Sequence, residues 1–350
     1  MQQRRDRYPT DMLVRRLSLH RARPTQLGAR LHFGAIVALL AGFASAQNID
    51  QARESARQAA NAARYPLFLS VMSDFGETSR VNFGKLKLNG TPDTSLTSLA
   101  VPWRHDFAFK DSKNALHVEA TAGYVSTRLD DADLWGGNLP GLETRTTSRT
   151  TAYALDVGIG PSLYLPDQGL FQPLLHLGLA HLENDTNFDG PGAAVTRALT
   201  DGVLFNWDGL YGFYGASLAL RPKYTMFNHV RATPLLRYDL RVTDGLDVDD
   251  SSLDNDETTQ WATLRVDFMG PTNLKVGDEA IRWHADVGYR YLFGETIDVM
   301  GFDDLYEITL GLESVDAKDI DADVGRILLT GGMQFADDTL GWTLGLAIRF

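Results

Sequence analysis

The sequence lacks cysteine altogether in its 350 residues. Disulfide bonds, thiolate metal sites and cysteine nucleophiles are therefore excluded. It also lacks an apolar run long enough for a spanning helix, because residues 33–43 form an uninterrupted run of only 11 residues and a transmembrane helix needs about 20. The chain must therefore be held by its fold alone, and a retained membrane anchor at residues 33–43 is the weaker interpretation.

The short apolar run has the flanks of a secretory signal. It is followed by Ala44, Ser45 and Ala46, which have the small-x-small form of a signal peptidase site. A basic stretch precedes it, with Arg15, Arg16, Arg21, Arg23 and Arg30. We therefore expect residues 1–46 to be a signal peptide that is removed after Ala46.

The remainder has little positive charge. Without the eight arginines and two aspartates of residues 1–46, it carries 25 basic and 43 acidic residues, a net charge of −18. Nucleic acid is thus not an expected partner, because phosphate binding requires a basic surface. H-E-x-x-H and G-x-S-x-G motifs are also missing. We predict a protein that is not an enzyme, with no catalytic residue, metal or cofactor.

Residues 48–64 are rich in alanine and are followed by Pro66, which predicts a slender helix. Residues 47–66 therefore form a separate helical or linker segment. Arg53, Arg57 and Arg64 share one face of this helix. It is either a solvated periplasmic helix or a helix thin enough to lie inside a pore.

Beyond this segment the dominant pattern has a period of two. In residues 282–293, Trp283, Val287 and Tyr291 share one face, and Arg282 and Asp286 share the other. Twelve such strands are predicted: 80–88, 99–109, 116–124, 153–165, 171–179, 210–220, 230–242, 262–268, 282–293, 306–312, 327–335 and 342–350.

The apolar face of these segments suits lipid and the polar face suits water, which is the inside-out arrangement of a membrane barrel. Residues 67–350 are thus predicted to form a 12-stranded antiparallel transmembrane β-barrel. Short links at 110–114 and 166–169 alternate with long ones at 127–150, 183–209 and 243–258. Outer-membrane barrels have short periplasmic turns and long external loops, so we expect both termini in the periplasm.

Charged residues of both signs are expected on the inward face. The predicted luminal set is Arg231, Arg237, Asp239, Arg241, Arg265, Asp267, Arg282, Asp286, Arg290, Glu307 and Glu313. Mixed signs are not typical of a strongly ion-selective pore. The set either forms an internally paired, solvated lumen or cradles the N-terminal helix, with Arg53 and Arg57 meeting carboxylates such as Asp286 and Glu307.

Two other groups of polar residues carry weaker signals. The acidic stretch between Asp244 and Glu257 lacks EF-hand spacing, so a solvated external loop is favoured over loose divalent-cation binding. The histidines are scattered, although His117 and His176 could share the lumen with serine or aspartate neighbours.

The end of the chain resembles the C-terminal signal by which the barrel assembly machinery recognises outer-membrane proteins. The residues that carry this resemblance are Trp342, Leu344, Leu346, Ile348 and Phe350. A helix at 48–64 followed by twelve strands resembles the translocator domain of autotransporters. The resemblance implies an outer-membrane location in a Gram-negative cell, lipid and lipopolysaccharide as surroundings, and a helix that threads the barrel. Almost nothing separates the expected cleavage site from the helix, so we expect a solitary barrel without a passenger.

Three functions remain open at this point. The first is an autotransporter-like barrel whose lumen holds its own N-terminal helix. The second is a porin-like channel for small solutes with the helix outside, and the third is a membrane-embedded lipid hydrolase. The fold alone does not choose among them.

Overall fold

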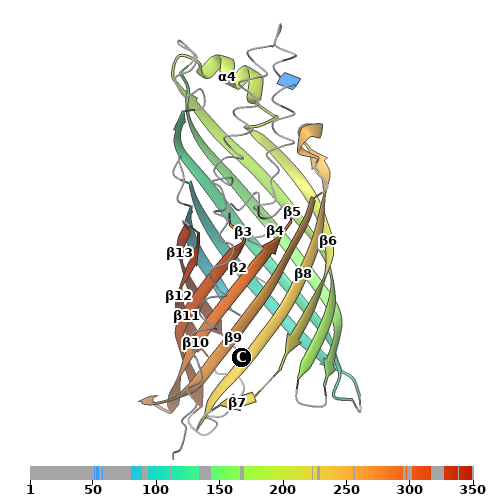
Figure 1. Cartoon of the computed structure of the whole chain (residues 1–350), viewed down its shortest axis with the longest axis vertical. Coiled ribbons are helices and arrows are strands. Elements are labelled where there is room, and N and C mark those ends of the chain that lie inside the picture. The colour runs from blue at the N-terminus through green and yellow to red at the C-terminus, as the bar shows by residue number, and fades with distance from the viewer. Residues whose placement is uncertain are drawn as a thin grey trace, which may run out of the picture.

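The computed structural model describes residues 80–88, 94–110, 112–133, 143–165, 169–222, 224–226, 229–254, 257–294, 302–316, 327–337 and 339–348, together with Gln51, Arg53, Glu54, Arg57 and Ile297. Most of them lie in strands (Figure 1). The elements are β1 (Val81–Leu88), β2 (Thr94–Ala108), β3 (Ala115–Asp133), β4 (Arg145–Tyr164), β5 (Leu170–Asp189), α4 (Ala193–Thr200), β6 (Trp207–Arg221), β7 (Tyr224–Met226), β8 (Val230–Val248), the 3-10 turn η2 (Ser251–Leu253), β9 (Glu257–Val276), β10 (Glu279–Phe293), β11 (Asp304–Asp316), β12 (Ile327–Ala336) and β13 (Thr339–Ile348).

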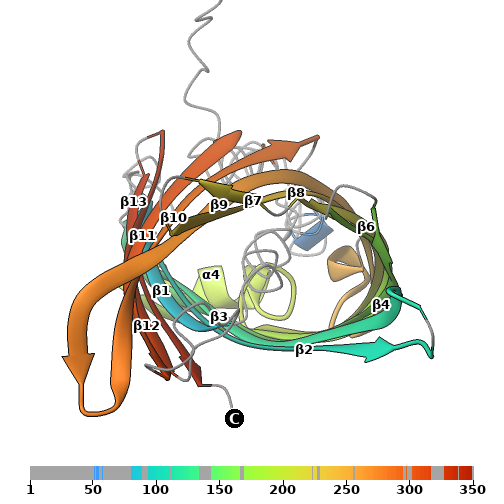
Figure 2. The same ribbon diagram turned by 90° about the horizontal axis from the view of Figure 1, so that it is seen from below.

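The strands close into a complete ring, seen along its axis in Figure 2. Each strand pairs antiparallel with its neighbours in the chain, and β1 closes the ring against β13, with Phe83 opposite Leu344. The three-residue β7 pairs with β8 in the register that β6 sets, so it is the end of the same wall strand. The 12-stranded antiparallel barrel predicted from the sequence is confirmed, as is closure of the last strand on the first.

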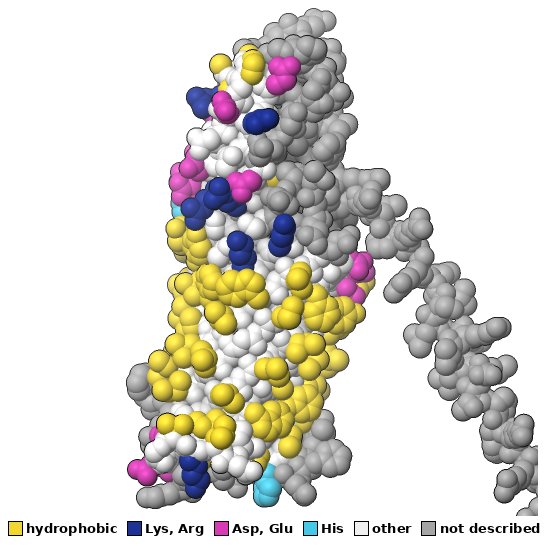
Figure 3. Space-filling model, turned by 90° about the vertical axis from the view of Figure 1, so that its left-hand side faces the viewer, with side chains coloured by type: hydrophobic (Ala, Val, Ile, Leu, Met, Phe, Trp, Pro, Cys, Tyr) yellow, Lys and Arg dark blue, Asp and Glu magenta, His cyan; other side chains and the backbone are white. Residues whose placement is uncertain are grey.

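The outer face carries an apolar band. On β5 the outward side chains Leu175, Leu177 and Leu179 are 69%, 69% and 52% exposed. Figure 3 shows hydrophobic side chains spread over the middle and lower part of the visible face. Leu344 and Ile348 of the predicted assembly signal belong to this band. Large exposed apolar side chains outside and charged side chains inside define a membrane-spanning barrel.

Aromatic pairs mark the edge of the band nearest to α4. Phe83 lies 5.5 Å from Trp342 between ring centroids, and Tyr124 lies 5.3 Å from Tyr153. Aromatic girdles of this kind are typical of membrane interfaces, where an amphipathic ring sits at the level of the head groups.

The wall continues beyond the band on one side of the barrel. On β5 the outward residues after Leu179 are His181, Glu183, Asp185 and Asn187, all exposed. β4 and β5 have 20 residues each and rise towards α4, whereas β12 and β13 have 10 and stop lower (Figure 1).

The prediction that 127–150, 183–209 and 243–258 are long links between strands is therefore wrong in part. Much of each range is strand, because alternation continues there with polar side chains on the outer face. The helix α4 also lies inside the second range. Its eight residues follow Gly192, and they are too few to give a clear helical period in the sequence. None of the helices within the described residues is long and apolar enough to cross a membrane.

The limits of the band can be tested on one face of one strand. Leu177→Arg places a charge within the band and should destabilise the barrel by about 2–4 kcal/mol, whereas Asn187→Arg, above the band, should cost about 0–1 kcal/mol. Equilibrium urea unfolding in lipid vesicles measures both variants. Equal costs would show that the band is misplaced.

Candidate functional site: the charged lumen

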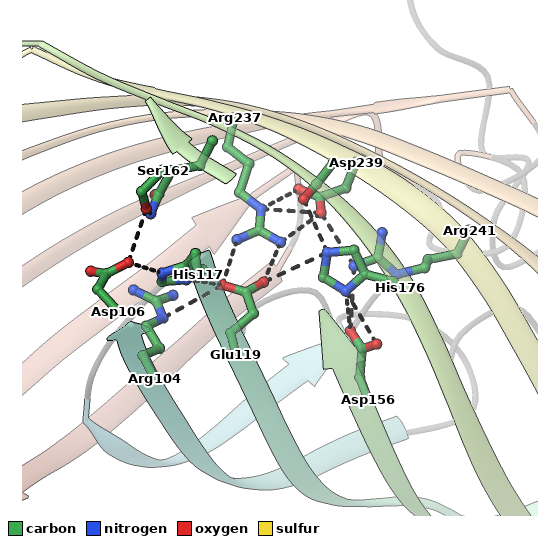
Figure 4. A network of polar contacts seen from close by, with 12 residues as sticks. Arg104, Asp106, His117, Glu119, Asp156, Ser162, His176, Arg237, Asp239 and Arg241 are labelled. Atoms are coloured by element: carbon green, nitrogen blue, oxygen red, sulfur yellow. Dashed lines mark hydrogen bonds and ion pairs between the residues drawn. The ribbon is translucent and has the colours of Figure 1, made fainter. Parts of the chain in front are cut away.

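The inner wall carries a network that joins strands across the barrel interior (Figure 4). Arg237 of β8 reaches Glu119 of β3, with 2.9 Å between Nη2 and Oε1, although β4, β5 and β6 separate these strands. Arg237 Nε also donates to Asp239 at 2.8 Å. Arg237 and Glu119 have side chains only 3% and 5% exposed. This contact is a desolvated ion pair that spans the lumen.

Glu119 gathers further partners from its own side of the wall. Arg104 Nε lies 3.7 Å from its Oε2 atom and His117 Nε2 lies 3.5 Å from it. His117 Nδ1 in turn lies 2.8 Å from Asp106 Oδ1. A buried carboxylate needs such compensation, because removing a charge from water is costly unless it is paired and hydrogen-bonded.

A second chain of contacts runs across β4, β5 and β6. His176 Nδ1 lies 3.0 Å from Asp156 Oδ2, and its Nε2 lies 3.0 Å from Ser217 Oγ. The ring passes close to Gly158, its register partner on β4, where a Cβ atom would lie 2.6 Å from His176 Cε1. Arg241 Nη2 completes the chain at 3.3 Å from Asp156.

This connectivity is that of a serine hydrolase triad, but the surroundings of Ser217 differ from those of a nucleophile. Ser217 is 1% exposed and pairs in register with Asp239. Glu119 Oε1 also lies 3.6 Å from His176 Nε2. A carboxylate at that position would oppose a developing oxyanion, so the chain is best described as a hydrogen-bonded brace of the wall.

Two more ionic groups line the interior. Arg80, just before β1, reaches Asp286 of β10, with 2.6 Å between Nη1 and Oδ2, and Arg265 Nη2 lies 2.9 Å from the same oxygen. Arg265 Nε also donates to Asp267. Nearby on the wall, Glu313 Oε2 lies 2.6 Å from Arg282 Nη2 and 2.7 Å from His284 Nε2. Arg80 and Asp286 form a second contact between strands that are not neighbours.

The remaining luminal residues predicted from the sequence lie on the same inner face. Arg290 is buried and its Nε atom donates to the Thr263 hydroxyl at 3.4 Å, while Glu307 accepts from Thr309 at 3.0 Å. Arg80, Glu119 and Asp156 were not predicted. For Glu119 the signal was present, because His117 and Glu119 alternate with Val118 and Ala120.

Towards the α4 end, the charges give way to an inner apolar surface. It consists of eight wall residues, Leu86, Leu96, Ala100, Val125, Ala152, Ala154, Ala180 and Leu182; they cluster with Trp207, Tyr211, Phe213 and Leu253. All are at most 9% exposed, although their strand positions face the lumen. Four of the eight are alanines, and Ala154 pairs in register with Ala180. This part of the lumen is lined for contact with apolar atoms rather than with water.

The N-terminal arginines contact the mouth of the barrel near α4. Arg53 Nη2 donates to the carbonyl oxygen of Asp201 at 3.0 Å, at the C-terminal end of α4, where a cation is favoured. Arg57 Nε lies 3.1 Å from Asp250 Oδ2, beside η2. Burial alone would raise the pKa of Asp250, but hydrogen bonds from Ser252 and Arg57 outweigh it and lower that pKa.

The alternative in which Arg53 and Arg57 pair with Asp286 and Glu307 is therefore wrong. Asp286 is already neutralised by Arg80 and Arg265 of the wall, and the N-terminal arginines meet acceptors at the rim instead. Arg64, the cleavage residues Ala44 and Ala46, and Phe350 lie outside the described residues.

No protein-family model and no curated protein matches this sequence. Among solved structures, the chain is similar to the β domain of the Bordetella autotransporter BrkA, with a TM-score of 0.45 and 15% identity over 77% of this chain and 99% of that one. It is also similar to the translocator domain of the autotransporter NalP from Neisseria meningitidis, with a TM-score of 0.42 and 14% identity over 84% of this chain and 97% of that one. A third similar structure is the KdgM porin, with a TM-score of 0.28 and 10% identity over 77% of this chain and 99% of that one. The chain's own wall and interior define its class: it is a membrane-spanning antiparallel β-barrel whose lumen is crossed by ion pairs.

Proposed function

We propose that this protein is an outer-membrane barrel of the translocator type whose lumen is occupied by its own N-terminal helix. The observation that carries the proposal is the position of two fixed points. Arg57 is bound to Asp250 at the mouth near α4, whereas Val81 at the start of β1 pairs with Leu346 near the other end of β13. The chain between Arg57 and Arg80 has to run from one mouth to the other, and the lumen is the direct route.

The inner apolar surface supports the same proposal. Leu86, Leu96 and Leu182 are 6%, 3% and 4% exposed, within a cluster that also holds Tyr211 and Phe213, and this burial favours an apolar filling of the lumen over water. A helix whose apolar side consists of alanines fits beside a wall that is itself rich in alanine, because small residues allow close approach of two backbones. The buried guanidinium of Arg80, directed inward to Asp286, would fix the chain where it enters β1.

Orientation in the membrane is part of the proposal. The connections at the α4 end include α4 and η2, whereas at the other end β9 and β10 are joined by two residues. Long connections are external in outer-membrane barrels, so the α4 end would face the cell exterior and both termini the periplasm. Assembly by the barrel assembly machinery would then use the last strand, from Trp342 to Phe350.

The absence of cysteine makes the position of the helix directly testable. Glu54→Cys with Ser251→Cys leaves the Arg57–Asp250 contact intact and places two thiols at its margins. The contact runs through a long arginine side chain, so a short bismaleimide is preferable to a disulfide, which requires Cα atoms within about 7 Å. We expect efficient crosslinking, read as a shift in electrophoretic mobility. Glu54→Cys with Glu307→Cys is the matched control and should not react; the reverse result would place the helix elsewhere.

The main alternative is a channel for small solutes, which the paired, polar part of the lumen would allow. A lipid hydrolase is the third possibility, and the Asp156–His176–Ser217 chain is the feature that raises it. Phospholipid turnover by the purified barrel, abolished by Ser217→Ala, would establish that activity. We expect no turnover, because Ser217 is buried in the wall.

A further inference from the structure

The outer face just beyond the apolar band is basic on one side of the barrel. Lys85 and Lys87 of β1, Arg128 of β3 and Arg149 of β4 all point outward and are exposed. We call these four residues the basic patch. Figure 3 shows dark blue side chains gathered immediately above the yellow band on this face.

Strand register places the basic patch along one continuous line. Lys87 pairs with Ser95, Ser95 with Arg128, and Arg128 with Arg149, so the line crosses four adjacent strands. Neighbouring strands are about 4.8 Å apart, which gives the line a length of roughly 14 Å. Lys85, two register pairs lower, stands beside Trp342 at the edge of the band. The charges therefore sit together at one level of the wall.

The two arginines of the basic patch are held in position by hydrogen bonds to neighbouring side chains on the outer wall. Arg149 Nη2 donates to the Tyr124 hydroxyl at 2.8 Å and Nε donates to Ser126 at 3.0 Å. Arg128 Nε donates to Asp130 at 2.8 Å. A guanidinium fixed in this way presents its other donors without further loss of side-chain freedom, and its planar fork can bind two oxygens of one phosphate group.

The same level on the next strands has the opposite charge. Arg149 pairs in register with Asp185, and Glu183 pairs with Asp208 of β6. At this level β1, β3 and β4 carry basic side chains, with Asp130 beside Arg128, whereas β5 and β6 carry acidic ones. A barrel that only favoured anionic lipids in general would not need basic residues on one side and acidic residues on the other. The basic patch therefore fits a ligand bound at one place on the wall.

We propose that the basic patch binds the phosphate groups of the acylated, phosphorylated glycolipid of the outer leaflet, the lipid A part of lipopolysaccharide. Phosphates lie where the hydrocarbon ends, which is the level of the patch. Acyl chains would cover the apolar wall directly below, at Phe83, Leu99 and Tyr153, which are 39%, 37% and 52% exposed. The proposal rests on the orientation proposed above, with the α4 end facing the exterior.

The test titrates the full-length mature barrel in detergent with diphosphoryl lipid A, dephosphorylated lipid A and phosphatidylglycerol, and measures bound lipid by native mass spectrometry. Lys85→Gln with Lys87→Gln should weaken the binding of diphosphoryl lipid A by roughly thirtyfold, on the basis of the attraction typical of two basic residues near an anionic membrane surface. Lys110→Gln with Lys113→Gln, which removes two exposed lysines from the opposite rim, is the matched control and should leave binding within about twofold of the wild type.

Three results would overturn the proposal: equal binding of dephosphorylated lipid A, equal losses in the two double variants, or tighter binding of phosphatidylglycerol. The last result would assign the patch to inner-leaflet lipid and reverse the orientation. Ion conductance of the Lys85, Lys87 double variant should match the wild type, so failure of the patch can be told apart from failure of the helix-filled lumen.

Discussion

Deletion of residues 47–64 should convert a barrel with little ion conductance into an open channel in planar bilayers. The interior of a barrel widens with strand number, so twelve strands enclose more space than side chains alone fill, and we expect a rise of about tenfold or more. In the intact protein the N-terminal helix would fill the part of the lumen next to the inner apolar surface. Its removal would leave Leu86, Leu96 and Leu182 facing water.

A synthetic peptide of residues 47–64 provides the matched control for this deletion. Added to the deleted barrel, it should reduce conductance again. The same peptide with Arg53→Gln and Arg57→Gln should be less effective, because it lacks the contacts with Asp201 and Asp250. Unchanged conductance after deletion would refute the helix-filled lumen and favour the channel with an external helix.

Arg237→Met should be among the most destabilising single substitutions in the barrel, at about 3–5 kcal/mol, because it leaves buried carboxylates without their shared cation. Glu119 and Asp239 both depend on this guanidinium, at 2.9 Å and 2.8 Å. Arg128→Met removes an arginine whose side chain is 61% exposed and paired with Asp130, so its effect on stability should be at most about 1 kcal/mol.

Urea unfolding in lipid vesicles, followed by tryptophan fluorescence, measures both substitutions. Adding Glu119→Gln to Arg237→Met should recover part of the loss, because residues in one ionic network do not act additively. Equal costs for Arg237→Met and Arg128→Met would mean that the cross-lumen pair contributes little to the stability of the barrel.

Alternation in the sequence was enough to predict the number of strands and the face of most side chains. A period of two places Trp283, Val287 and Tyr291 on the outward face and Arg282 and Asp286 on the inward face. This assignment does not depend on which strands pair with this one. The lengths of the strands were harder to predict from the sequence. Outside the band, both faces of β5 become polar at Asn184 and Asp185, so the contrast that marks a membrane strand disappears although the strand continues.

The partners of the charged residues were not predictable from the sequence. The alternation of residues along a strand shows which face a side chain lies on. Its height in the wall depends on the strand register, and a shift of one residue changes that register. The pairing of Glu119 with Arg237 depends on the register of four successive strand pairs. Arg57 and Asp250 meet through a turn beyond the end of β8, so no strand pattern could indicate their contact.

The brevity of β1 has a mechanical consequence. With eight residues it is the shortest of the twelve wall strands. It forms seven register pairs with β2 and eight with β13, whereas β4 and β5 share seventeen. Tension applied to the chain ahead of Arg80 is delivered to this strand first, where the fewest backbone hydrogen bonds resist it. Amide exchange should therefore be fastest, among the wall strands, along Val81–Leu88, and the wall should yield there before it yields anywhere else.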